Sequence, residues 1–415
     1  MTKRLSILIT ALLLVSTVST VFTKVQAADW PTWRGADRTD ISTEKGLLQS
    51  WPEGGPKQLW TFKNAGNGYS SFAIANGTLY TLGTRDEKEI LIVLDAETGK
   101  DKGAVVIGDI LSNNWGNGPR GTPTVAGGVV YAMGGGGSLI AADSQTGVVK
   151  WKVNMSDFGG KKPGWGYCES VTVEGDQVIC TPGGSQGAMV ALRVKDGSKI
   201  WQSSGITDGA QYASILPIEH NGRRQYVQLT QQHVFGVDAQ SGKVIWKSPW
   251  EGRTAVVPTP IYKDGHVYIS SGYGVGCKLV KLGNGSATEV YRNQVMKNHH
   301  GGVLLVGDYL YGYSDGPGWL CQNFKSGEMV WNSKNLGKGA VTYADGRLYA
   351  ISESDASVVL LDASPDGYQE HGRFKLGPLS SIRSDRGRVW THPVISNGKL
   401  YLRDQDIIYC YDIAR

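Results

Sequence analysis

A turn containing glycine recurs along this chain of 415 residues at an almost constant interval. In most copies an acidic or polar residue precedes Thr-Gly, Ser-Gly or Asp-Gly, and the apolar strand that follows ends in an aromatic residue. An interval of 40 to 50 residues is typical of one four-stranded blade of a β-propeller. The repeat therefore predicts an all-β fold of antiparallel blades. The turn glycines are Gly99, Gly147, Gly197, Gly242, Gly285, Gly327 and Gly367.

The fullest copy, from Gly121 to Trp151, shows what one unit contains. An apolar strand, a glycine turn, an apolar strand with tyrosine, a glycine-rich stretch and a third strand precede the closing aromatic. A large aromatic there can pack between neighbouring sheets, and glycine allows the positive φ of the turn. The first copy, KGAVVIG, has no aromatic at this position. The later copies close with Trp151, Trp201, Trp246, Tyr291, Trp331 and Phe374.

Each end of the repeat region holds an incomplete copy. Trp60, in GPKQLWTF, has no turn before it, whereas the copy that begins at Thr391 ends shortly after Asp412 without a fourth strand. The strand around Trp60 supplies what the last copy lacks. We therefore expect an eight-bladed β-propeller, closed by a blade that combines both ends of the chain, because closure removes the exposed edge of an open array.

The first residues have the pattern of a secretory signal peptide. Lys3 and Arg4 precede an apolar run, and Val25-Gln26-Ala27 has the small residues of a cleavage site. An uncleaved anchor is the alternative, although the run is short for a membrane span and rich in Ser and Thr. The first cysteine is Cys168, so a lipid anchor has no attachment residue directly after the run.

The expected organisation follows from these patterns. Residues 1–27 form the signal peptide, residues 28–55 an extended lead-in, and residues 56–415 the propeller. The protein is expected to be exported, periplasmic or secreted, monomeric, and without stable membrane insertion.

Charge and cysteine usage limit the classes of partner. The formal net charge is +5, and removal of Lys3, Arg4 and Lys24 with the signal leaves +2, which argues against a nucleic-acid binder. Five cysteines form no C-x-x-C motif, so neither haem attachment nor a thiolate metal site is indicated. We expect small buried residues within strands at Cys168, Cys180, Cys277, Cys321 and Cys410.

The repeat resembles that of a known family. The segments GVDAQSGKVIW (Gly236 to Trp246) and AADSQTGVVKW (Ala141 to Trp151) are similar to the tryptophan-docking repeat of the pyrroloquinoline quinone (PQQ)-like β-propellers. The lead-in DWPTWRGADRTDIS resembles the start of many exported members. This family contains quinoprotein dehydrogenases and also scaffolds such as the assembly factor of the outer-membrane β-barrel machinery, so the resemblance implies a fold and leaves the activity open.

A candidate site lies at one mouth of the channel. Residues just before the innermost strand of each blade are expected to ring this mouth, where Arg can bind carboxylates and Trp or Tyr can stack on a ring. The pattern predicts a site for an anionic, partly planar or sugar-like ligand. The alternative is that these loops are simply polar, with aromatics sealing the blade ends. Adjacent strand residues point to opposite faces, so His299 and His300 do not predict a metal site. The predicted residues are Tyr69, Trp115, Arg120, Trp165, Tyr167, Glu169, Tyr212, Arg253, His299, His300, Lys338, Trp390 and His392.

Two functions follow from the resemblance. A PQQ-dependent alcohol dehydrogenase would hold the quinone between a Trp and a disulfide of adjacent cysteines, with Ca²⁺ and a carboxylate base, and Trp165, Trp390 and Glu169 could serve. This chain has no Cys-Cys pair, no cytochrome motif and one acidic residue at the predicted mouth. We therefore favour a binding or interaction scaffold for proteins, extracellular polymers or a small anionic ligand. No cofactor is expected, and no catalytic residue is assigned.

Overall fold

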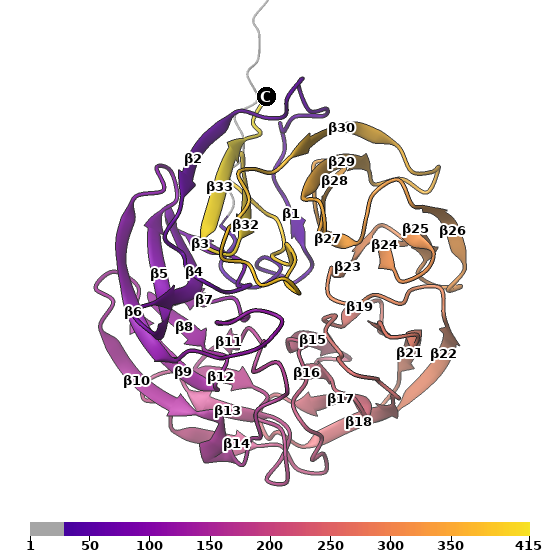
Figure 1. The fold of residues 1–415 in the computed structure, drawn as a ribbon. Coiled ribbons are helices and arrows are strands. Elements are labelled where there is room, and N and C mark those ends of the chain that lie inside the picture. Colours follow the sequence, from indigo (N-terminus) through magenta and orange to yellow (C-terminus); the bar gives the residue numbers. More distant parts are fainter. Residues whose placement is uncertain (1–28) are drawn as a thin grey trace, which may run out of the picture.

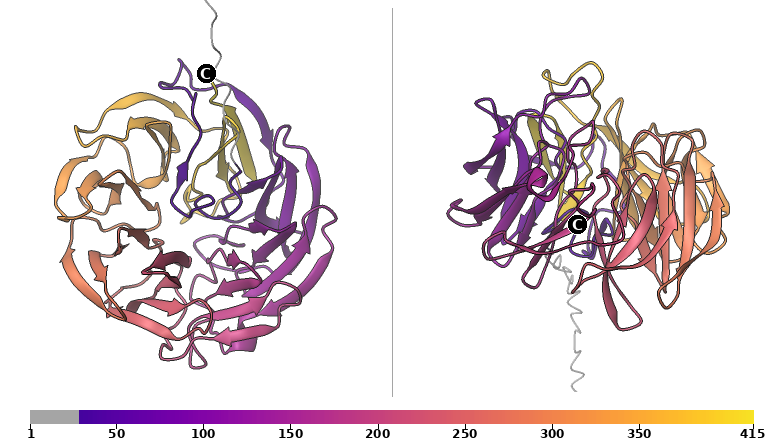
Figure 2. Two further views of the ribbon diagram at one scale, coloured as in Figure 1. Left: turned by 180° about the vertical axis from the view of Figure 1, so that it is seen from behind. Right: turned by 90° about the horizontal axis from the view of Figure 1, so that it is seen from below.

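The computed structural model describes residues 29–415, and the predicted signal peptide lies outside these residues. Eight sheets form a closed ring, with their innermost strands around a central channel (Figure 1). The views from behind and from below show the same ring as a thick disc (Figure 2). The prediction of an eight-bladed propeller is confirmed. Apart from one short 3-10 helix, η1 (Met155–Phe158), the regular structure of the described residues is β. Within them, no helix is long and apolar enough to cross a membrane.

The first four blades follow one another along the chain, each running from the channel to the rim. The first blade consists of β3 (Ala73–Ala75), β4 (Thr78–Arg85), β5 (Lys88–Asp95) and β6 (Asp101–Asp109), and the second of β7 (Thr124–Ala126), β8 (Val129–Met133), β9 (Ser138–Asp143) and β10 (Val149–Asn154). The third consists of β11 (Thr172–Glu174), β12 (Gln177–Cys180), β13 (Val190–Arg193) and β14 (Lys199–Gln202). The fourth consists of β15 (Leu216–His220), β16 (Arg223–Leu229), β17 (His233–Asp238) and β18 (Val244–Pro249).

The last four blades have the same order, with additions from the N-terminal segment in two of them. The fifth blade consists of β19 (Ile261–Lys263), β20 (His266–Ser271), β21 (Gly276–Leu282) and β22 (Ala287–Asn293), and the sixth of β23 (Val303–Val306), β24 (Tyr309–Ser314), β25 (Gly318–Asn323) and β26 (Met329–Ser333). The seventh consists of β1 (Ile41–Ser42), β27 (Gly339–Ala344), β28 (Arg347–Ser352), β29 (Ser357–Asp362) and β30 (Glu370–Lys375). The eighth consists of β31 (Val394–Ser396), β32 (Lys399–Asp404), β33 (Ile407–Asp412) and β2 (Gln58–Phe62).

The ring closes as the incomplete copies predicted. β2 pairs antiparallel with β33, with Trp60 opposite Cys410, so the outermost strand of the last blade comes from the N-terminal part of the chain. This pairing gives β33 the neighbour that it would otherwise lack.

Four turn glycines face the closing aromatic residue of the preceding blade, namely Gly99, Gly197, Gly242 and Gly327. A Cβ atom on Gly242 would lie 2.4 Å from the ring of Trp201, so only glycine leaves room for the indole. The indole N–H of Trp201 donates to the carbonyl of Ala239 at 3.2 Å. At the junction of the last blade with the first, a Cβ atom on Gly99 would lie 2.6 Å from the ring of Trp60. Gly147, which follows the copy without an aromatic, faces Val105 instead. One kind of contact therefore joins several blades, the first to the last included.

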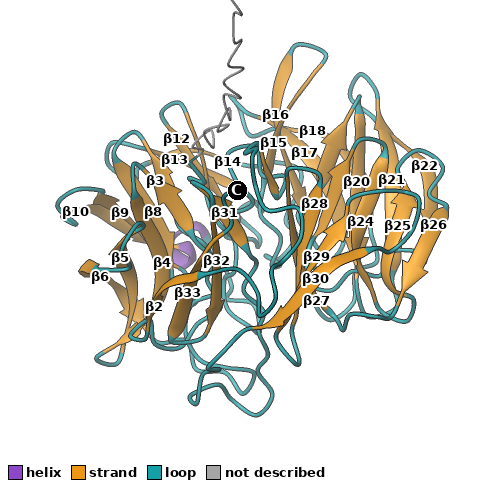
Figure 3. Ribbon diagram, turned by 90° about the horizontal axis from the view of Figure 1, so that it is seen from above, coloured by secondary structure: helices purple, strands orange, loops and turns teal. Residues whose placement is uncertain are grey.

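The lead-in passes through the channel, a location that the sequence pattern did not indicate. Trp30 exchanges two backbone hydrogen bonds with Ile74 of the first blade, and β1 pairs in parallel with the inner strand β27. Figure 3 shows the loops that surround this region and project from the faces of the ring. Cavities of about 220 Å³ and 770 Å³ lie against the segment, the larger one lined by Arg38 and by inner strands such as β11.

Two buried arginines fix the lead-in to the blades. The guanidinium of Arg34 lies 2.7 Å from the Asp40 carboxylate and donates to the carbonyl of Val303 at 2.5 Å. Burial lowers the pKa of Arg38 to about 10, so it stays protonated at neutral pH. Its guanidinium donates to three carbonyls at the start of inner strands, those of Ser170, Val171 and Ile215, at 3.0, 2.6 and 3.2 Å. A single side chain thus connects two blades.

Gly242→Ala should lower the free energy of unfolding more than Gly222→Ala does. Both glycines have nearly the same positive φ, +69° and +70°, but a Cβ on Gly222 meets nothing within 4 Å. Gly222→Ala, the control, should lower the free energy of unfolding by about 1 kcal/mol, because alanine is strained in the left-handed conformation. Gly242→Ala should lower it by about 1–3 kcal/mol more, because the new methyl group overpacks against Trp201. Equal losses in urea unfolding would contradict the docking role of the glycine.

Arg38→Met should destabilise the protein by about 3 kcal/mol, because the buried carbonyls that Arg38 binds lose their donors. Lys45→Met is the control, since Lys45 pairs with Asp345 while its side chain stays 70% exposed, and it should change stability by less than about 0.5 kcal/mol. Equilibrium unfolding in guanidinium chloride measures both. A loss below about 1 kcal/mol for Arg38→Met would show that the carbonyls find other partners.

Candidate ligand-binding site at the channel mouth

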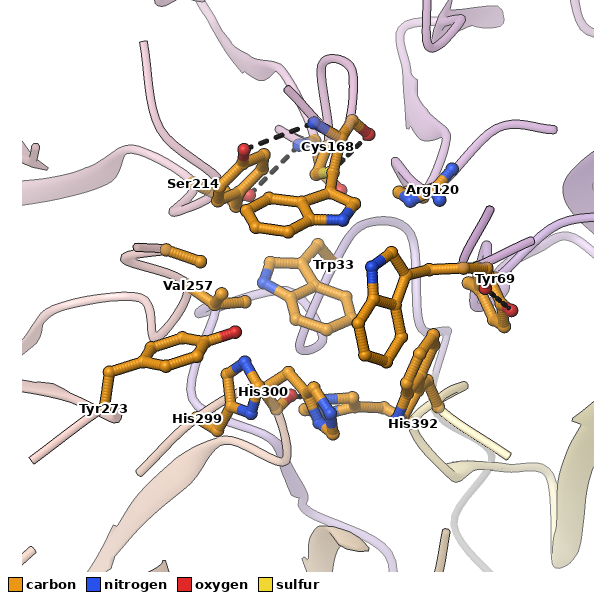
Figure 4. A pocket seen from close by; sticks show the side chains of 16 residues that line it. Trp33, Tyr69, Arg120, Cys168, Ser214, Val257, Tyr273, His299, His300 and His392 are labelled. Carbon is orange, nitrogen blue, oxygen red and sulfur yellow. Dashed lines mark hydrogen bonds between the residues drawn. The ribbon is translucent and has the colours of Figure 1, made fainter. Parts of the chain in front are cut away.

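An aromatic cavity of about 220 Å³ lies at one mouth of the channel (Figure 4). Trp33 of the lead-in lies between the walls, with its indole N–H donating to Thr259 Oγ1 at 3.1 Å. Trp165 and Tyr212 form one wall, with their rings 5.8 Å apart. The opposite wall contains His299 and His300, whose rings stack at 4.4 Å. The cavity thus presents several ring faces within a small volume.

The predicted mouth residues divide into two groups. Four do not line this cavity: Tyr167, Glu169, Arg253 and Lys338. The others do: Tyr69, Trp115, Arg120, Trp165, Tyr212, His299, His300, Trp390 and His392. That they bind a ligand stays a prediction.

Alternation of side chains explains two of the residues outside the cavity. Cys168 lines the cavity, so its neighbours Tyr167 and Glu169 point away from it. Tyr167 packs in the core and its hydroxyl donates to the Pro182 carbonyl at 3.1 Å. Glu169 accepts a hydrogen bond from the Thr181 amide at 2.6 Å, and burial raises the pKa of its carboxyl to about 7. Neither side chain is available to a ligand here.

The remaining two lie beside or outside the cavity. Arg253 is exposed. Lys338 lies behind the histidine wall, where its ammonium contacts His299 Nδ1 at 2.9 Å and Asp315 at 2.8 Å.

Several residues that line the cavity were not predicted from the sequence. Trp33 belongs to the lead-in, where a second Trp close after Trp30 was the available signal. Tyr273 has a positive φ of 56°, unusual for a residue with a side chain, and its ring meets His299 edge-on at 4.4 Å. The other lining residues that the sequence did not indicate are Cys168, Ser170, Ser214, Ala255 and Val257.

The histidines of the wall are neutral at physiological pH. Burial, followed by repulsion from Lys338, lowers the pKa of His299 to about 4. Since Nδ1 of His299 accepts from Lys338, Nε2 carries the proton. Burial also lowers the pKa of His300 well below its ordinary value. The wall therefore offers uncharged ring faces.

A carboxylate that the sequence did not indicate supports this wall from behind. Glu353 accepts a hydrogen bond from the indole N–H of Trp390 at 3.1 Å and lies 3.2 Å from Nε2 of His300. Burial raises the pKa of Glu353. Its role in the structure is to orient these two rings.

Arg120 supplies the positive charge among the lining residues. It donates to the carbonyls of Gly118 and Gly116 at 2.8 and 2.9 Å, and it lies 5.4 Å from the centre of the Tyr69 ring. The hydroxyl of Tyr69 donates to the Trp115 carbonyl at 2.5 Å. These contacts hold the loop before Arg120 over the cavity. Within residues 29–415, Arg120 has no carboxylate at ion-pair distance. The buried carboxylate of Glu89 interacts with it only at longer range, so the guanidinium can still pair with an anion.

The lining does not fit a quinone held with Ca²⁺. Hard cations need several oxygen ligands, but no lining residue has a carboxylate. Throughout the described part of the chain, no group of three or more His, Cys, Asp or Glu residues could hold a metal ion, and the five cysteines are unpaired.

Comparison with known proteins establishes the family. The family model described as outer membrane protein assembly factor BamB matches residues 44–157 and, in an overlapping match, residues 101–333. The chain belongs to this family of PQQ-like β-propellers. This PQQ-like propeller is 25% identical over 238 residues to the outer membrane protein assembly factor BamB of Yersinia pestis. The match covers 52% of the chain and 55% of that relative, so the chain spans about half of its length.

Solved structures share the fold of this PQQ-like propeller. BamB from Moraxella catarrhalis has a TM-score of 0.61 at 16% identity, covering 86% of this chain and all of that one. The quinohemoprotein alcohol dehydrogenase from Comamonas testosteroni has a TM-score of 0.65 at 12% identity, covering 92% of this chain and 80% of that one. Because these identities are low, the likeness concerns the fold alone.

Lys338→Met should raise the pKa of His299 towards 6.5, because it removes the positive charge beside Nδ1 while the burial remains. Histidine NMR of ¹³C-labelled protein measures this pKa. Lys195→Met, at an exposed turn between β13 and β14, is the control and should leave the His299 titration unchanged.

The same shift makes stability depend on pH. His299 in the folded protein binds its proton only near pH 4, whereas the unfolded chain binds it near pH 6.5. Folding should therefore lose stability as the pH falls from about 6.5 to about 4, and Lys338→Met should reduce the share that comes from His299. An unchanged titration of His299 in Lys338→Met would contradict the assigned contact.

Proposed function

We propose that this PQQ-like propeller is an exported binding scaffold and that the aromatic cavity at the channel mouth is its site for a ligand or for part of a partner. The observation that carries this proposal is the construction of the cavity. Rings from the lead-in and from several blades converge there beside one unpaired guanidinium. Such concave, largely apolar sites with few placed polar groups are typical of ligand binding.

The relatives support an interaction role. One is named an outer membrane protein assembly factor, and the fold of another solved member is the same. The site also presents exposed apolar surface, since the lining residue Trp115 is 42% exposed. A protein, an extracellular polymer or a small anion could contact this surface. Export to the periplasm or beyond agrees with the names of the relatives and with the predicted signal peptide.

The size of the cavity limits what enters it. Sites for drug-sized ligands usually measure roughly 300–1,000 Å³, whereas this cavity measures about 220 Å³. A single six-membered ring fits within this volume, and a larger ligand would extend from the cavity into solvent.

Single-ring fragments should bind at this cavity and lose affinity when its aromatic walls are truncated. Saturation-transfer NMR with a panel of monosaccharides and aromatic acids should show binding to the wild type. Trp115→Ala and Trp390→Ala should each weaken it about fivefold, because a lost stacking face costs on the order of 1 kcal/mol.

Met329→Ala, which truncates an exposed residue of the outer strand β26, is the control and should bind like the wild type. Fragment binding that is absent, or equal in all four proteins, would contradict the site. In parallel, PQQ with Ca²⁺ should show no saturable binding by calorimetry. Saturable 1:1 binding that is lost in Arg120→Ala and Trp390→Ala would instead support the dehydrogenase alternative.

A further inference from the structure

We infer that the cavity receives one ring of an acidic saccharide, with the sugar carboxylate at Arg120. This inference rests on the proposed function, because it names the ligand class of the same site.

Donors without protein partners surround the cavity. The indole N–H groups of Trp115 and Trp165 and the hydroxyl of Tyr273 make no hydrogen bond within residues 29–415. The hydroxyl of Tyr212 accepts from the Trp165 amide at 3.3 Å, and that of Ser214 accepts from the Ser170 amide at 3.0 Å, which leaves both protons for an acceptor. Such donors favour a ligand that places acceptor oxygens opposite them.

These donors lie on different sides of the cavity. Figure 4 shows Ser214 at the upper left, Tyr273 at the lower left and Arg120 at the upper right, around the indole of Trp33. An aromatic acid carries its acceptors only at its substituents. A sugar ring carries oxygens around its whole edge and presents C–H groups from its faces, so it matches a ring of donors around an aromatic platform.

The charge at the site selects an acid. Arg120 is bound to backbone carbonyls but to no carboxylate in the described chain, and a guanidinium can still donate its remaining N–H groups to a carboxylate. The histidine wall is neutral, so no second charge competes within it. A neutral sugar would form no ion pair with this guanidinium, whose electrostatic partner Glu89 lies beyond ion-pair distance.

The rim of the cavity also combines an aromatic ring with a cation. Arg386 lies 5.8 Å from the centre of the Trp115 ring, and the two loops that carry them meet where Ser384 donates to the Asn114 carbonyl at 3.5 Å. An exposed indole beside a second cation can contact the next residue of an acidic chain. A polymer should therefore bind more tightly than its free monomer.

Calorimetric titration of the full mature chain tests this inference with four probes: galacturonic acid, its tetramer, the neutral galactose tetramer and benzoate. We expect saturable 1:1 binding of the acidic tetramer, at least tenfold tighter than that of the neutral tetramer and tighter than that of the acidic monomer. Arg120→Gln should weaken the acidic tetramer about tenfold more than it weakens the neutral one, because the lost contacts with Gly116 and Gly118 affect both tetramers while the lost charge affects only the acid. Lys195→Gln, which removes the same charge at an exposed turn, is the control and should bind like the wild type.

Tyr273→Phe serves as a second variant, because it keeps the ring on His299 and removes only the donor. It should weaken both tetramers several-fold without changing the melting temperature. Equal binding of acidic and neutral tetramers, or no effect of Arg120→Gln in a folded protein, overturns the inference.

The result also separates the inference from the proposed function. If benzoate or other single rings bind in a Trp115-dependent manner and no saccharide does, the acidic saccharide is wrong and the binding site stands. If the acidic monomer and tetramer bind equally, the polymer part is wrong. If no ring binds, both proposals fail.

Discussion

The contact between a closing aromatic and the turn glycine of the next blade occurs at four of the seven turn glycines. The indole or phenol ring fills the place of a side chain at the glycine, as Trp201 does at Gly242. The same contact joins Trp60 to Gly99, between the last blade and the first. Since the ring closes on itself, β33 gains a neighbour in β2, and the loops at the channel mouth rest on a continuous frame.

The lead-in completes the cavity that the blades surround. Arg34 and Arg38 donate to carbonyls in or just before inner strands. The lead-in pairs with β3 through Trp30 and with β27 through β1, and it fills part of the channel. Trp33 is thereby held beside His392, with their rings 4.6 Å apart. The cavity owes its shape to this segment as much as to the blades, because its central ring face comes from residues that precede the repeats.

Burial gives the site its electrostatic character. The stacked histidines remain neutral because charging them would cost solvation and repulsion from Lys338, while Glu353 behind them is occupied by Trp390. Arg120 forms no ion pair with a carboxylate of residues 29–415, although Glu89 interacts with it at longer range. Neutral ring faces around one guanidinium support recognition of an anionic ring, which is the basis of the proposed binding role.

The repeat spacing alone determined the blades, their number and the closure by Trp60, because every blade must bury its faces against two neighbours. The same spacing placed Trp390 and His392 just before an inner strand, near the mouth. Only the tertiary structure decided which side chains enter the cavity: Glu169 turns into a blade by alternation, and Trp33 arrives from the lead-in. Side-chain direction in irregular loops depends on contacts between segments far apart in sequence, and a local pattern does not contain those contacts.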